Sequence, residues 1–153
     1  RLICFASGPV RPRCERLAEE LGIVKAVQFL DWIDEEELID WLSVCDVFVS
    51  IPDVDSTPHS LLMAFAAGLP VIVSDLPAYR EWIEDGQNGF LVSPGDEEAL
   101  RRRILELLRD TEKRRVWGAR NRSLVEERGD RDTEMEKLLD LYRGLLNRTG
   151  DRA

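Results

Sequence analysis

The chain alternates between short apolar runs and longer amphipathic stretches. The apolar runs are four to six residues long and are bounded by polar or turn residues, which predicts strands buried on both faces. They cover residues 2–6, 26–30, 46–51, 69–74 and 89–92. The stretches between them have the apolar spacing of helices, and three of them end at a glycine. They cover residues 11–21, 35–45, 58–67 and 78–85.

Strands that alternate with helices of about ten residues imply right-handed βαβ units. We therefore expect an α/β fold with a Rossmann-like, doubly wound parallel sheet. After residue 96 the pattern is helical only, and apolar residues that share a helix face predict helices that cover the sheet. These residues are Leu100, Ile104, Leu107 and Leu108, and later Leu138, Leu139, Leu141, Tyr142 and Leu145. The sequence predicts one domain over residues 1–153, with a sheet core over 1–96 and a helical tail over 97–153.

Composition narrows the classes of partner. The 153 residues include 44% hydrophobic residues, which is enough for one domain with a sizeable core. The net charge of -9 argues against a nucleic-acid partner or an anionic membrane surface. Residues 1–99 hold 6 basic and 19 acidic side chains, whereas residues 100–153 hold 15 and 11. The basic tail is interpreted either as solvated surface helices or as a docking surface for a partner domain.

Several kinds of segment are not expected. The apolar runs are interrupted by Gly and Pro and are far shorter than the roughly 20 residues that cross a bilayer. The first residues show no cleavage-site pattern, so we expect no signal peptide and a cytoplasmic protein. Cys4, Cys14 and Cys45 are odd in number and lack CxxC spacing, which predicts reduced core thiols and neither disulfides nor a metal site.

In an open parallel sheet, ligands bind beyond the carboxyl ends of the strands. That rule selects the loops at residues 7–11, 31–34, 52–60 and 75–80. The third loop opens the most apolar helix of the chain, where Thr57 can cap the helix and Pro58 suits its first turn. The backbone N–H groups of His59, Ser60 and Leu61 would then form a site for a phosphate. An ordinary capped helix is the alternative.

The residues from 55 to 73 carry a specific resemblance. The run DSTPHSLLMAFAAGLPVIV resembles the donor-site signature of the glycosyltransferase group 1 family, whose enzymes have the GT-B architecture. Further pieces follow in the order found in that family, among them a Gly8-Pro9 loop, the strands at 27–30 and 46–49, and the segments at 74–77, 81–92 and 94–96. The resemblance covers roughly residues 2–128, and the family's C-terminal, donor-binding domain is the part that it matches.

This resemblance implies retaining transfer from a nucleoside diphosphate sugar, without a cofactor other than this substrate and usually without a metal. Asp55 matches the acidic residue that contacts hydroxyls of the donor sugar. Other matched positions bind the rest of the donor: Gly8 in the Gly-Pro loop, Trp32 and Ile33 at the nucleobase, Ser56, Thr57, His59, Ser60 and Leu61 around the diphosphate, and Met63 at the ribose.

Three residues depart from the family pattern. Met63 stands where the family has a Glu that bonds the ribose hydroxyls, and a thioether is a much weaker acceptor. Ala78 and Tyr79 replace a small loop that contains glycine, which narrows the site beside the third strand. Asp31 stands at a position that is usually Gly.

The resemblance also implies parts that the sequence does not contain. Family members carry a further βα unit, whose Arg and Lys neutralise the diphosphate, and an N-terminal acceptor-binding domain. Here only Arg11, Arg13 and Arg80 lie near the expected ligand edge, so we expect the isolated chain to be a poor enzyme. We also expect the strand at residues 2–6 to present an unpaired edge, through which the chain can self-associate.

Other interpretations remain open. The chain is either the donor-binding half of a glycosyltransferase or a catalytically silent GT-B-like module for binding or assembly. A flavodoxin-like receiver or flavin module is a weaker alternative, because no acidic cluster or phosphate loop follows the first strand. Asp53 and Asp55 could form a carboxylate pair for glycoside hydrolysis. His59, the single histidine, is typical of a capping or surface residue.

Overall fold

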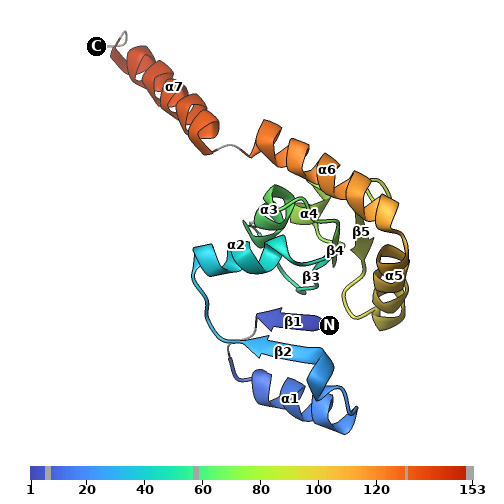
Figure 1. Ribbon diagram of the computed structural model, residues 1–153. Coiled ribbons are helices and arrows are strands. Elements are labelled where there is room, and N and C mark those ends of the chain that lie inside the picture. Colours follow the sequence, from blue (N-terminus) through green and yellow to red (C-terminus); the bar gives the residue numbers. More distant parts are fainter. Residues whose placement is uncertain (6–7, 57–58, 130, 151–153) are drawn as a thin grey trace. The chain divides into compact units, whose positions relative to one another are not determined.

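The computed structural model describes residues 1–5, 8–56, 59–129 and 131–150 (Figure 1). Its elements form two compact units, Arg1–Trp41 and Leu42–Ala153, and each has its own parallel sheet. The α/β fold with parallel strands is therefore confirmed, with strands that pair in two groups.

The first unit is built on a pair of strands. Its elements are β1 (Leu2–Phe5), α1 (Arg11–Glu20), the 3-10 helix η1 (Val24–Ala26), β2 (Val27–Leu30) and most of α2 (Glu35–Ser43). β1 and β2 pair in parallel, with Leu2 opposite Val27 and Phe5 opposite Leu30. Gly22 follows α1 with a φ of +67°, the left-handed conformation in which glycine ends a helix.

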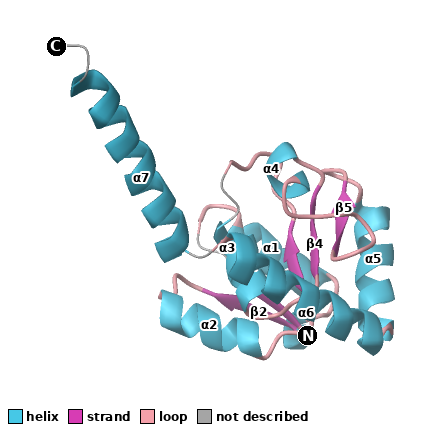
Figure 2. Ribbon diagram, turned by 90° about the horizontal axis from the view of Figure 1, so that it is seen from above, coloured by secondary structure: helices cyan, strands magenta, loops and turns pink. Residues whose placement is uncertain are grey.

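The second unit contains a three-stranded parallel sheet in the order β3-β4-β5. Its elements are β3 (Phe48–Ser50), α3 (His59–Ala66), β4 (Val71–Ser74), α4 (Pro77–Arg80), β5 (Gly89–Val92), α5 (Glu97–Arg109), α6 (Thr111–Arg128) and α7 (Arg131–Gly150). All four residues of the central strand β4 are buried. Figure 2 shows β4 and β5 side by side with α5 next to them, as their mutual contacts require.

The core of this unit joins the sheet to the helices that follow it. Ile72, Phe90 and Val92 from the sheet pack with Leu107 of α5 and Trp117 of α6. The rings of Phe90 and Trp117 meet edge to face with their centroids 4.9 Å apart, a favoured geometry for aromatic pairs. The helices α5 and α6 therefore cover the sheet as the sequence predicts.

The contact between α3 and α6 depends on two glycines. Gly68 follows α3 with a φ of +73°, and Gly118 lies in α6 directly against it. A Cβ atom at Gly118 would lie 2.0 Å from the carbonyl oxygen of Gly68, far inside van der Waals contact. The two backbones can approach this closely only because residue 118 has no side chain.

Next to this contact, the buried side chains of Asn88 and Asn121 form a hydrogen-bonded pair. The Asn121 amide nitrogen donates to the carbonyls of Leu69, at 2.8 Å, and of Asn88, at 2.9 Å. The Asn88 amide nitrogen donates to Asn121 Oδ1 at 2.9 Å and to the Trp82 carbonyl at 3.0 Å. Because Asn121 lies on α6, this pair joins that helix to the segments that lead into β4 and β5.

Several details differ from the sequence-based expectations. The outer residues of β1, Leu2 and Phe5, are exposed rather than buried, because a unit this small has few elements to cover its sheet. Cys14 is a free thiol on the exposed surface of α1, so it is not a core residue. The helix expected over residues 78–85 is a single turn, Pro77–Arg80.

Fewer apolar side chains of the helical tail are buried than the sequence predicts. Leu108 of α5 is exposed, as are Leu138, Leu139, Leu141 and Tyr142 of α7, while the Leu145 side chain lies outside the described residues. In the part of the chain that the structure describes, none of the helices combines the length and apolarity needed to cross a bilayer. The cytoplasmic compartment and self-association through β1 stay predictions.

Candidate functional site

The loops that follow β3 and β4 lie together at one edge of the second unit's sheet. β3 and β4 are parallel neighbours, with Ser50 opposite Val73, so their carboxyl ends coincide. The buried Ser74 hydroxyl at the end of β4 donates a hydrogen bond to the Pro52 carbonyl at 2.6 Å. This bond ties the loop after β3 to the end of β4, where the predicted loop at 75–80 begins.

A second connection between these loops involves Asp55. The Tyr79 hydroxyl of α4 donates to Asp55 Oδ2 at 2.7 Å, and Asp55 Oδ1 accepts from the Ser56 backbone N–H at 2.7 Å. Ser50 Oγ lies 3.3 Å from the Tyr79 hydroxyl oxygen. A phenol has one hydrogen, which is directed at Asp55, so the Ser50 hydroxyl is the donor to Tyr79. A chain of hydrogen bonds thus runs from Ser50 through Tyr79 to Asp55.

The surroundings of Tyr79 keep its phenol protonated. The Tyr79 side chain is fully buried. Burial raises the pKa of its phenol; the bond from Ser50 acts in the opposite direction, and the Asp55 carboxylate raises this pKa further. The phenol is therefore protonated at neutral pH and donates to the carboxylate. In the sequence Tyr79 stands out only as a bulky replacement for glycine, because spacing along the chain does not indicate the partner of its hydroxyl.

The start of α3 lies just beyond Asp55. The side chains of His59 and Ser60 are exposed, whereas Leu61 is fully buried and can offer a ligand only its backbone N–H. The expected capping residue Thr57 and the first-turn Pro58 lie outside the described residues. The phosphate site at these amides stays a prediction.

Met63 occupies the next turn of α3, four residues after His59 and on the same side of the helix. Its side chain is half-buried. A polar side chain of similar length at this position would therefore reach solvent without displacing the buried residues of this helix, which are Leu61, Ala64 and Phe65.

The remaining predicted site residues belong to the first unit. Gly8 has a φ of +140°, which favours glycine, and its carbonyl accepts from the Arg11 backbone N–H at 3.2 Å. Trp32 is 81% exposed and Ile33 is half-buried in the segment after β2. These residues follow the carboxyl ends of β1 and β2, but the assignment of Trp32 and Ile33 to a nucleobase stays a prediction.

Two of the three arginines near the expected ligand edges pair with carboxylates. Arg80 binds Asp75 through two bonds, Nε to Oδ1 at 2.6 Å and Nη2 to Oδ2 at 2.8 Å. Arg80 thereby lowers the pKa of the Asp75 carboxyl group. Arg11 pairs with Glu15 at 2.8 Å and also with Asp31. These contacts compete with any anionic ligand for both guanidinium groups.

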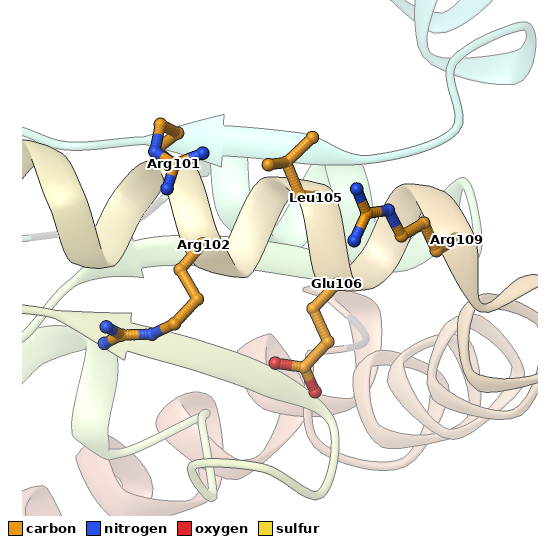
Figure 3. Close-up of a pocket in the computed structure, with 5 residues that line it drawn as sticks. All are labelled: Arg101, Arg102, Leu105, Glu106 and Arg109. Carbon is orange, nitrogen blue, oxygen red and sulfur yellow. The ribbon is translucent and has the colours of Figure 1, made fainter.

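A pocket on α5 is lined by Arg101, Arg102, Leu105, Glu106 and Arg109 and by no residue of the strand-end loops (Figure 3). All five residues come from one helix, and Glu106 already accepts from Arg103 and Lys113. One helix forms no enclosing wall, so the strand-end loops remain the candidate site. Among the residues that the structure describes, no three His, Cys, Asp or Glu side chains gather as a group that could hold a metal ion.

Comparisons with known proteins show the family to which the chain is similar. The family model described as Glycosyl transferases group 1 matches residues 2–124. A D-inositol 3-phosphate glycosyltransferase of Corynebacterium urealyticum is 34% identical over 149 residues, which are 94% of this chain and 35% of that protein. The chain thus spans about a third of the length of this relative.

Solved structures show the same fold. Sucrose-phosphate synthase from Thermosynechococcus elongatus superposes with a TM-score of 0.86 at 27% identity, covering 95% of this chain and 38% of that one. HepE from Anabaena, solved in complex with UDP-glucose, superposes with a TM-score of 0.81 at 21% identity, covering 88% of this chain and 36% of HepE.

Proposed function

The chain belongs to the group 1 glycosyltransferases, and we propose that it is the part of such an enzyme that binds the nucleoside diphosphate sugar. One observation carries the proposal beyond family membership. The Asp55 carboxylate, in the loop between β3 and α3, is held by hydrogen bonds from Tyr79 and Ser56. A fixed carboxylate in the loop that leads into a helix supports the binding of a ligand with sugar hydroxyls and phosphates.

Asp55 and the start of α3 bind different parts of the donor in this proposal. Asp55 accepts hydrogen bonds from hydroxyls of the donor sugar. The backbone N–H groups at the start of α3, with the positive end of the helix dipole, bind the diphosphate. The exposed side chains of His59 and Ser60 leave this end of the helix open to a ligand. A HepE structure, whose fold the chain shares, contains UDP-glucose, which is a ligand of this class.

Transfer itself would take place in a longer protein. Because the chain spans about a third of its relatives' length, we propose that the remaining part binds the acceptor and that the whole enzyme transfers the sugar with retention. A leaving diphosphate needs cationic or amide support in the transition state. Arg11 and Arg80 are paired with carboxylates here, which supports low activity of the chain by itself.

The alternative is a catalytically silent binding or assembly module, and Met63 is the observation that favours it. Calorimetric titration separates the two functions when the chain is titrated with a nucleoside diphosphate and with its sugar nucleotide. UDP with UDP-glucose and GDP with GDP-mannose are two such pairs. A donor-binding domain binds one nucleotide pair and distinguishes the sugar nucleotide from its bare nucleoside diphosphate. Absence of binding by every ligand would favour the silent module.

Asp55→Ala tests the assignment of the sugar contact. We expect the affinity for the sugar nucleotide to fall at least tenfold, since bonds to a charged group contribute roughly 1.5 to 3 kcal/mol each, while the bare nucleoside diphosphate binds as before. The melting temperature also falls, because the buried Tyr79 hydroxyl loses its acceptor. The ratio of the two affinities, and not the melting temperature, therefore decides whether Asp55 contacts the sugar. An unchanged ratio in a folded variant contradicts a sugar contact at Asp55.

Met63→Glu tests the ribose position. A carboxylate restores two acceptors where the family has them, so we expect at least tenfold tighter binding of the nucleoside diphosphate. The half-buried position keeps the desolvation cost of the charge small. Met63→Gln is the matched control, because it has similar length without the charge and should give a smaller gain. Equal affinities of wild type and both folded variants would mean that the ribose lies elsewhere.

A further inference from the structure

The burial of the ring and the backbone hydrogen bonds of Tyr79 hold this residue in place. The ring of Tyr79 is fully buried, and the backbone carbonyl of Tyr79 accepts from the backbone N–H groups of Trp82, at 3.0 Å, and of Ile83, at 2.8 Å. Its own N–H donates to the Leu76 carbonyl at 3.0 Å. The phenol therefore points at Asp55 from a rigid support, which is what accurate placement of a functional side chain requires.

The bonds to Asp55 leave it with unused acceptor capacity. A carboxylate has about four lone-pair directions, two on each oxygen. Tyr79 occupies one on Oδ2, and the Ser56 N–H occupies one on Oδ1. Among the described residues these are the bonds to its oxygens, so each oxygen can accept one further bond, and Asp55 is partly exposed.

We infer that Tyr79 is a positioning residue, which orients the Asp55 carboxylate toward the sugar of the donor through the bond from its hydroxyl to Oδ2. This inference rests on the proposed function, because it assumes that Asp55 contacts the sugar. Tyr79 itself touches no substrate. Its effect on binding passes through Asp55 and is therefore confined to the sugar, while the diphosphate contacts at α3 stay unchanged.

The structure offers a matched control for this role. Ser74 ties the same loop to the end of β4 through the Pro52 carbonyl, without touching Asp55. Tyr79→Phe removes the hydroxyl and keeps the ring, whereas Ser74→Ala loosens the loop and keeps the bond from Tyr79. If Tyr79 acted only as a tether of the loop, the two variants would have the same effect on ligand binding.

The experiment measures the affinities of wild type and variants for a nucleoside diphosphate and for its sugar nucleotide, with UDP and UDP-glucose or GDP and GDP-mannose as the pair. For Tyr79→Phe we expect about tenfold weaker binding of the sugar nucleotide and unchanged binding of the bare diphosphate. For Ser74→Ala we expect an unchanged ratio of the two affinities. In the Asp55→Ala background, Tyr79→Phe should have no further effect on the ratio.

The outcomes separate this inference from the proposed function. If wild type binds neither ligand of any pair, the proposed function fails and the inference fails with it. If wild type distinguishes the two ligands but folded Tyr79→Phe keeps the same ratio, the inference alone is overturned. It is also overturned if Ser74→Ala changes the ratio as much as Tyr79→Phe does, or if Tyr79→Phe still changes it when Asp55 is alanine.

Discussion

Gly118→Ala should destabilise the second unit by about 3 kcal/mol, although the same change in an open helix is favourable. Alanine is preferred over glycine inside helices by up to about 1 kcal/mol. At this position, however, the new Cβ atom would lie 2.0 Å from the Gly68 carbonyl oxygen and 2.9 Å from its carbon. These are backbone atoms, so α3 and α6 must move apart, and overpacking of this kind costs roughly 1 to 3 kcal/mol or more.

Gly144→Ala in α7 is the control for this change. Apart from its chain neighbours and the backbone of its own helix, no atom of the described residues lies within 4 Å of the position that its Cβ would take, so the helix preference acts and stability should rise slightly. Thermal unfolding measures both variants. We expect Gly118→Ala to lower the melting temperature by roughly 10 °C, given about 2 to 4 °C per kcal/mol for a chain of this size. A Gly118→Ala variant that melts at or above wild type would contradict the close contact.

The order of elements could be predicted from the sequence because each strand is a local apolar run. All five strands and the turn glycines Gly22 and Gly68 lie where the pattern places them. The tail was harder to predict. Leu138 and Leu141 have helical spacing in α7 yet are exposed, because periodicity indicates which residues share a face but does not indicate whether another element covers that face.

The candidate site could be predicted as a location but not as a set of contacts. The rule for strand ends selects four loops, and hydrogen bonds from Ser74 and Tyr79 reach one of them, the loop at 52–60 that contains Asp55. The bond from Tyr79 to Asp55 links residues 24 positions apart, and neither residue signals the other in the sequence. A buried hydroxyl requires a partner, but the identity of that partner depends on how the chain folds. The residue roles toward a donor stay predictions until ligands are measured.

Asn121→Leu should cost about 3 to 5 kcal/mol, a large share of the roughly 5 to 15 kcal/mol that stabilises a typical domain. Leucine branches at the same atom and is larger than asparagine, so the change leaves no cavity. It removes the donor to the carbonyls of Leu69 and Asn88 and the acceptor for the Asn88 amide. Each buried polar group left without its partner costs about 1 to 3 kcal/mol, which exceeds the gain from burying the apolar side chain.

Ser123→Leu is the matched control, because Ser123 lies two residues further along α6 on the exposed surface. A polar-to-leucine change there should alter stability by no more than about 0.5 kcal/mol. Chemical denaturation of both variants gives the two free energies of unfolding. Similar small losses at positions 121 and 123 would show that α6 is not held by this bond network. A large loss confined to Asn121→Leu would show that hydrogen bonds from α6 hold the ends of β4 and β5 in place, and with them the sheet on which the candidate site is built.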